Sequence, residues 1–214
     1  MVHINIFTIC PKSFASNTYL LLSGTSAMVI DPSVSIDAID KVLRANNATL
    51  VGALLTHGHF DHIISIDTLR EQHNAPVYVH KNDACMLTDG KLNGFYTFFE
   101  RECVHSPADI LFDDGDEILI GSETIKVLHT PGHSQGSCCF IFNDDENKIA
   151  IITGDTLFSN SIGRTDLYGG SIYELKKSIE KLSQFDKKAL IYPGHNESAA
   201  LGEALDSVSY YFEL

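Results

Sequence analysis

Basic residues are scarce in this 214-residue sequence, which has 15 Lys and Arg against 28 Asp and Glu and a formal net charge of −13. Proteins that bind nucleic acid usually rely on clustered Lys and Arg. The sequence therefore predicts no nucleic-acid partner. Its apolar fraction of 44% is ordinary for a folded globule and excludes intrinsic disorder.

Long apolar runs are also missing. A membrane span needs roughly 18–20 consecutive apolar residues, and no stretch reaches that length. The N-terminal stretch MVHINIFTIC has no basic patch followed by an apolar run and a small-residue cleavage site, so we expect no secretory signal. These absences favour a cytoplasmic protein without a membrane partner. The length indicates one domain over residues 1–214, present as a monomer or a small homo-oligomer.

Paired cysteine motifs are absent as well. The five Cys are an odd number and none shows CxxC spacing, which excludes a disulfide framework and a structural Cys-zinc site. Cys138 and Cys139 are adjacent in an apolar run, where a strand would point one inward and the other outward. We expect both to be packing residues. The unusual residue is histidine, which occurs ten times.

Short apolar, β-branched runs alternate along the chain with turns or with segments of helical spacing. Helices are expected from Ser35 to Asn46, from Ile63 to about His73 and over 172–183, with a short helix after residue 80. The aromatics of 95–99 indicate either packing or one side of a cleft. Strands are expected over 2–9, 18–23, 26–31, 50–56, 77–80, 117–120, 123–129, 138–142, 148–153 and, as the last one, 190–192. This order suggests an α+β fold of two sheets packed face to face, with helices outside.

Four of these strands end in the same way, with a Gly- or Thr-bearing turn and then a side chain that can bind metal. The four segments are ALLTHGHFDH (53–62), IKVLHTPGH (125–133), IAIITGD (149–155) and ALIYPGH (189–195). Functional groups gather beyond the carboxyl ends of strands in sheets flanked by helices. We therefore expect the four endings to converge on one site.

The convergent residues are seven: His57, His59, Asp61, His62, His133, Asp155 and His195. Imidazole and carboxylate together suit Zn or Fe, and seven donors are too many for one ion. We assign His57, His59 and His133 to one divalent ion and Asp61, His62 and His195 to a second, with Asp155 shared by both. Zinc is expected first, with iron or manganese as alternatives. A hydroxide bridging the two ions would be the nucleophile, and Asp61 would both ligate and orient it.

The motifs resemble those of a known family. THGHFDH (56–62) is similar to the THxHxDH signature of metallo-β-lactamase-fold hydrolases, and PGHSQGS (131–137), GDTLF (154–158), GRTD (163–166) and YPGH (192–195) resemble later motifs of the glyoxalase II-like branch. This resemblance implies an αββα sandwich of two mixed sheets, a dinuclear site and hydrolysis of a thioester such as S-lactoylglutathione. Because 19 residues follow His195 (214 − 195), the chain resembles the short form without a C-terminal helical domain.

Substrate contacts and reaction type leave alternatives open. Arg164 is the candidate for binding a substrate carboxylate, since its planar fork suits bidentate pairing, although a surface ion pair explains it equally well. Tyr168 is a second candidate for the same pocket. Two other functions fit the same motifs. One is an iron-dependent persulfide dioxygenase that holds its ion with His57, His133 and Asp155, and the other is a lactonase or β-lactamase-type hydrolase.

Overall fold

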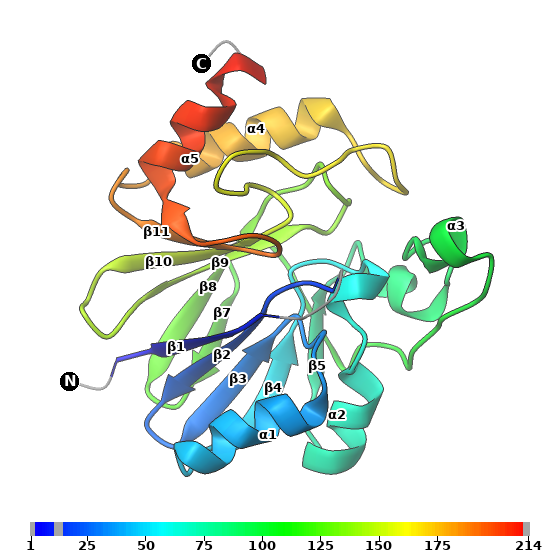
Figure 1. Cartoon of the computed structure of the whole chain (residues 1–214), viewed down its shortest axis with the longest axis vertical. Coiled ribbons are helices and arrows are strands. Elements are labelled where there is room, and N and C mark those ends of the chain that lie inside the picture. Colours follow the sequence, from blue (N-terminus) through cyan, green and yellow to red (C-terminus); the bar gives the residue numbers. More distant parts are fainter. Residues whose placement is uncertain (1–2, 11–14, 212–214) are drawn as a thin grey trace.

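Two six-stranded sheets form the centre of the computed structural model, which describes residues 3–10 and 15–211 (Figure 1). The first sheet contains, in spatial order, β1 (Asn5–Ile9), β2 (Thr18–Ser23), β3 (Ser26–Ile30), β4 (Thr49–Leu54), β5 (Val77–His80) and β6 (Ile110–Phe112). The second contains β12 (Ala199–Ala200), β11 (Leu190–Pro193), β10 (Ile149–Gly154), β9 (Cys138–Asn143), β8 (Glu123–His129) and β7 (Glu117–Ile120).

Both sheets are mixed. Strands β3 to β6 pair in parallel while β1, β2 and β3 pair antiparallel. In the second sheet only β10 and β11 are parallel. The helices are α1 (Ile36–Ala45), α2 (Ile66–His73), α3 (Phe95–Phe99), α4 (Ile172–Leu182) and α5 (Leu201–Val208), and the 3-10 turns are η1 (Phe60–His62), η2 (Ala84–Thr88) and η3 (Ser209–Tyr211). None of these described helices is long and apolar enough to cross a bilayer.

Apolar side chains fill three layers between the elements. One cluster, which includes Tyr19, Met28 and Phe140, lies between the two sheets. A second packs α1 and α2 on the outer face of the first sheet, and a third packs α4 and α5 on the second sheet. The order helix, sheet, sheet, helix is visible in Figure 1. The expected αββα sandwich is therefore confirmed.

The adjacent cysteines follow the alternation expected of a strand. Cys138 belongs to the cluster between the sheets, and Cys139 belongs to the cluster beneath α4 and α5. Both side chains are buried and free of disulfides. They pack in two different layers, as the sequence predicted.

The expectation that 190–192 is the last strand is wrong, because β12 and α5 follow it. Helix α5 packs Leu201, Ala204, Leu205 and Val208 on the second sheet at helical spacing. The strand expected over 2–9 is observed from Asn5, and residue 2 lies outside the described residues. Strand β6 was not predicted. It has only three residues, two of them exposed, so its sequence shows no alternation of apolar and polar residues.

Phe140 tests the layer between the sheets, where its ring is fully buried. We expect Phe140→Ala to lower the free energy of unfolding by about 3–5 kcal/mol, because a large cavity replaces the ring. Leu119→Ala is the matched control, since Leu119 is 69% exposed on the edge strand β7, and it should change stability by less than about 0.5 kcal/mol. Urea unfolding followed by circular dichroism measures both. Equal losses in the two variants would contradict this packing.

Candidate metal centre

The seven predicted donors meet at one edge of the sandwich, where strands of both sheets end. Strand β4 of the first sheet leads to His57, while β8, β10 and β11 of the second sheet lead to His133, Asp155 and His195. Parallel strands present their carboxyl ends at the same edge of a sheet, which brings Asp155 and His195 together. Asp61 and His62 lie on the 3-10 turn η1.

Three imidazoles form the first group of donors. The Nε2 atom of His133 lies 2.8 Å from Nδ1 of His59 and 3.2 Å from Nε2 of His57. All three side chains are buried. Their nitrogens therefore face a common point and could hold one ion.

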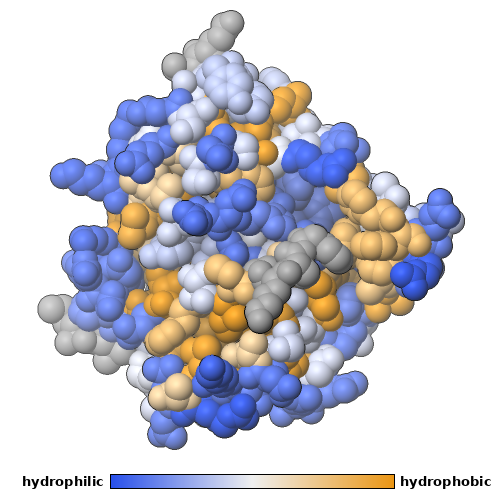
Figure 2. Space-filling model, in the orientation of Figure 1, coloured by the Kyte–Doolittle hydropathy of each residue, from blue (hydrophilic) through white to orange (hydrophobic). Residues whose placement is uncertain are grey.

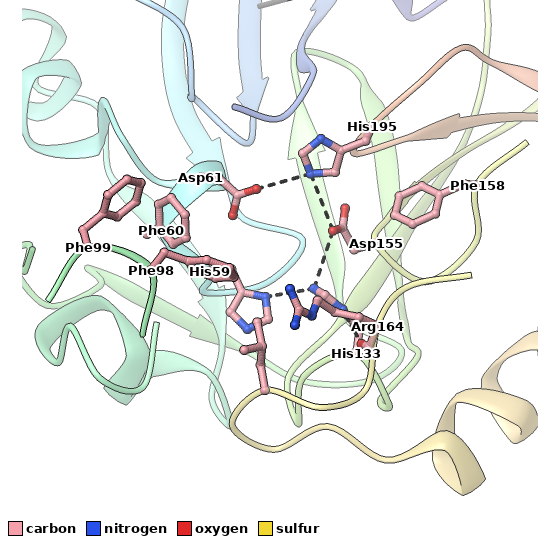
Figure 3. Close-up of a pocket in the computed structure, with 11 residues that line it drawn as sticks. His59, Phe60, Asp61, Phe98, Phe99, His133, Asp155, Phe158, Arg164 and His195 are labelled. Atoms are coloured by element: carbon pink, nitrogen blue, oxygen red, sulfur yellow. Dashed lines mark hydrogen bonds and ion pairs between the residues drawn. The ribbon is translucent and has the colours of Figure 1, made fainter. Parts of the chain in front are cut away.

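The second group joins η1 to the end of β11. Nε2 of His195 lies 3.3 Å from Oδ2 of Asp61, and donor atoms of Asp61, His62 and His195 lie within 4.8 Å of one another. Asp155 lies between the groups, with Oδ1 3.3 Å from Nε2 of His62 and Oδ2 3.5 Å from Nε2 of His133. Figure 3 shows Asp155 between His133 and His195. This carboxylate faces both groups.

The chemistry of the cluster fits two cations. Burial, followed by repulsion from neighbouring imidazoles, lowers the pKa of His57 well below its usual value and that of His59 to about 3. Both rings are therefore neutral at pH 7 and have a lone pair for a metal. Within the described part of the chain, the buried atoms Nε2 of His62 and Oδ1 of Asp155 have no hydrogen-bond partner. Buried polar atoms are rarely left in that state, and an ion between them would satisfy both.

Hydrogen bonds to the outer nitrogens orient two of the imidazoles. Nδ1 of His62 donates to Oδ2 of Asp31 at 2.8 Å, and Nδ1 of His133 donates to the carbonyl of Arg164, also at 2.8 Å. Because both acceptors are oxygens without a proton, each Nε2 is directed into the site. Asp31 also accepts from the amide and hydroxyl of Thr56, at 2.8 and 2.7 Å. Such contacts fix the tautomer and the ring orientation of metal-binding histidines.

Asp83 is a supporting residue that the sequence analysis missed. Its buried carboxylate accepts from the amide of Gly58 at 3.0 Å, the hydroxyl of Ser134 at 2.6 Å and the amide of Gly136 at 2.6 Å. It thereby ties the His57–His59 loop to the loop that carries His133. Asp83 follows the short strand β5, and no recognisable motif surrounds it in the sequence. Its partners Ser134 and Gly136 lie 51 and 53 positions further along the chain.

Glycine is required where the loops touch. A side chain at Gly194 would collide with the carboxylate of Asp155 and the ring of His62. At Gly154, which has φ +48°, a Cβ would lie 2.6 Å from Oγ1 of Thr56. The Gly residues of the GD and PGH motifs therefore permit the close approach of the donors.

A cavity of about 550 Å³ opens onto the donors. It is lined by His59, Phe60, Asp61, Phe98, Phe99, His133, Asp155, Phe158, Arg164, Leu167 and His195. Arg164 thus lies where the sequence analysis expected it, and it also forms the alternative ion pair, with Nε and Nη2 each 2.7 Å from an oxygen of Asp166. Tyr168 is not among the described lining residues. The neighbouring Leu167 lines the cavity.

Two packed mixed sheets with a buried cluster of His and Asp at their shared edge define an enzyme of the metallo-hydrolase class. The family model of the metallo-β-lactamase superfamily matches residues 12–195. The chain belongs to this superfamily.

Relatives of similar length share much of the sequence. An uncharacterized protein of Mycobacterium leprae, ML0493, is 40% identical over 87% of this chain and 88% of its own length. The probable metallo-hydrolase YqgX of Bacillus subtilis is 38% identical over 84% of each chain.

Solved structures share the fold. The BLEG-1 B3 metallo-β-lactamase has a TM-score of 0.86 and 33% identity, covering 94% of this chain and 96% of its own. ETHE1 from Myxococcus xanthus has a TM-score of 0.77 and 26% identity, covering 94% and 81%. TTHA1623, solved in a di-iron-bound form, has a TM-score of 0.78 and 29% identity, covering 92% and 96%. The resident metal of this fold is therefore not fixed by the fold alone.

A substitution of Asp31 tests whether hydrogen bonds orient the donors, because Asp31 is not itself a proposed metal ligand. We expect Asp31→Asn to lower zinc affinity by about 10–100-fold, because His62 loses a charged acceptor. Asp40→Asn is the matched control, since Asp40 pairs with Arg44 at 3.0 Å on α1, away from the donors. Competition with a chromogenic zinc chelator measures both affinities. Unchanged affinity in a folded Asp31→Asn protein would contradict this role.

Proposed function

We propose that this chain is a dinuclear metal-dependent hydrolase that cleaves a thioester, in the manner of glyoxalase II acting on S-lactoylglutathione. The observation that supports this most directly is the position of Asp155, whose two oxygens face both groups of donors. The donors proposed for one ion are His57, His59 and His133. Those proposed for the other are Asp61, His62 and His195, with Asp155 shared.

The lining of the cavity indicates that water is the nucleophile. Its described lining residues include no Ser or Cys to act as a nucleophile, and its His and Asp side chains are the proposed metal ligands. Two divalent ions, when bound, lower the pKa of a water held between them and polarise a substrate carbonyl. The protein supplies the donors and a cavity for the substrate beside them.

We assign to Asp61 the role of orienting the attacking water. Burial raises its pKa, but the hydrogen bond with His195 and the charge of His62 outweigh burial and hold the pKa below its usual value. Asp61 is therefore a carboxylate at neutral pH, and it accepts a hydrogen bond from water rather than donating one. A thiolate is a good leaving group, so the reaction needs no strong general acid.

A second candidate function is hydrolysis of a β-lactam, which the likeness to the BLEG-1 B3 metallo-β-lactamase favours. The same water would attack an amide carbonyl, and the same side chains would hold the metal ions. An amine leaves less readily than a thiolate, so this reaction needs a proton donor in addition. Assays with penicillin and S-lactoylglutathione on one preparation compare the two functions. The third alternative, an iron-dependent persulfide dioxygenase, would instead consume oxygen with glutathione persulfide and hold one iron per chain.

The proposal is tested by metal content and turnover measured together. We expect about two metal ions per chain and hydrolysis of S-lactoylglutathione or a related thioester by the zinc-loaded protein. Free thiol is followed with a chromogenic disulfide. A folded protein that holds two ions but hydrolyses no thioester in a broad panel would contradict the proposal.

Asp155→Ala tests the shared carboxylate. We expect metal content to fall to about one ion or fewer per chain and kcat/KM to fall by more than about 100-fold, because both ions lose a ligand. Elemental analysis and the thiol assay measure the two effects. Asp206→Ala, an exposed carboxylate on α5, is the control and should change neither. Unchanged metal content in Asp155→Ala would show that Asp155 is not shared.

A further inference from the structure

Apart from the His and Asp donors, the wall of the cavity is almost entirely apolar. Five of the eleven lining residues are apolar (Phe60, Phe98, Phe99, Phe158 and Leu167), and five are donors. Arg164 is the remaining one. A ligand in this cavity therefore contacts aromatic rings and one cation besides the donors. A peptide-like group with many polar atoms would lose hydrogen bonds against such a wall.

Phe60 organises one side of this wall. It lies on η1 between the donors His59 and Asp61, and Figure 3 shows its ring beside those of Phe98 and Phe99. Its ring centroid is 5.8 Å from that of Phe98 and 5.7 Å from that of Phe99, with the Phe99 pair edge-to-face. The aromatic wall, defined here as Phe60, Phe98 and Phe99, thus adjoins the donors directly.

The aromatic wall is held by the backbone. The amide of Phe60 donates to the carbonyl of Asn93 at 3.0 Å, and the buried side-chain amide of Asn93 donates to the carbonyl of Cys103 at 2.9 Å. These bonds fix the loop before α3 to η1. The wall is therefore formed before any ligand binds, which reduces the entropy cost of binding.

Helix α3 exposes more aromatic surface than packing requires. None of its residues is buried, and Phe98 is 49% exposed. Figure 2 shows apolar residues gathered on the side of the molecule where α3 lies. Exposed apolar groups of this kind mark contact sites for ligands, and here the exposed ring of Phe98 lines the cavity beside the donors.

The other polar feature, Arg164, lies at the edge of the cavity. Its side chain is 49% exposed, and Asp166 already accepts from Nε and Nη2. Its guanidinium carbon lies 5.5 Å from the ring centroid of Phe98. Arg164 thus presents a positive charge near solvent that Asp166 neutralises only in part. This suits an anionic group on the thiol arm of a thioester as it leaves the cavity.

We propose that the acyl arm of the substrate is apolar, an aryl or medium-chain alkyl group that packs on the aromatic wall, while the thiol arm runs past Arg164 to solvent. This inference rests on the proposed thioester hydrolysis and names its substrate class. It assigns Phe98 as a residue that determines specificity for the acyl group. A short hydroxylated acyl group such as lactoyl leaves the aromatic wall uncovered.

The test compares glutathione thioesters that differ only in the acyl group: acetyl, D-lactoyl, hexanoyl and phenylacetyl. Each buried methylene gains roughly threefold in kcat/KM. Hexanoyl has four more methylenes than acetyl, so it should exceed acetyl by on the order of 80-fold. Phe98→Ala should lower kcat/KM for hexanoyl by roughly tenfold and for acetyl by less than about twofold. Phe98→Leu, which keeps apolar volume, should retain most of the preference.

Tyr96→Ala is the matched control. Tyr96 lies on the same helix, is 42% exposed and is not among the described lining residues, so its removal should leave every kcat/KM unchanged. Fastest turnover of D-lactoyl thioester, with no effect of Phe98→Ala, would overturn the inference and leave thioester hydrolysis standing. No turnover of any thioester by protein holding two zinc ions would instead overturn the proposed function.

Binding gives a readout that does not depend on turnover. Isothermal titration of the zinc-loaded protein with hexanoate and D-lactate should show hexanoate binding at least about tenfold more tightly. Phe98→Ala should remove most of that difference, and Tyr96→Ala should not. Equal or tighter binding of D-lactate would overturn the inference.

Discussion

The carboxylate of Asp155 is the constraint on which the site depends. It is almost fully enclosed, and burial alone would raise its pKa, yet the charges of His62, His133 and His195 hold the pKa well below its usual value. A buried charge is tolerated only when it is paired. The charge of Asp155 is therefore tolerated only because histidines from the surrounding loops lie close enough to pair with it. The same arrangement gathers imidazole nitrogens and carboxylate oxygens into two clusters that share Asp155, which is the arrangement that two cations need.

The fold meets this requirement by placing strand ends of two sheets at one edge. Asp31 and Asp83 then connect the loops: Asp31 joins the end of β3 to Thr56 and His62, and Asp83 joins the loop of Gly58 to that of Gly136. Glycines allow these loops to touch. The cavity beside the donors is walled by η1, α3 and the segment between β10 and α4, and their Phe and Leu side chains give it its apolar character.

Much of the fold could be predicted from local pattern. The bounds of β2, β5, β7 and β8 agree with the sequence, because apolar runs between turn residues specify them. The seven candidate donors stand out in the sequence because His and Asp at four strand ends have no packing explanation. Asp83 could not be found, since its partners are distant in sequence and no motif surrounds it. Tyr168 and Leu167 are adjacent in a Gly-rich loop, and the sequence does not say which of their side chains faces the cavity. Helix α5 was missed although its spacing is amphipathic, so that signal was available.

Membership of the metallo-β-lactamase superfamily and the composition of the cavity bear on different questions. Membership of the superfamily explains why the chain has these metal donors. The composition of the cavity concerns which substrate group packs beside the donors.

The most direct test of the central claim is anomalous X-ray diffraction from a zinc-soaked crystal. The account predicts two peaks about 3.5–4 Å apart with one oxygen of Asp155 near each or one shared between them. A single peak, or two peaks of which neither contacts Asp155, would contradict it.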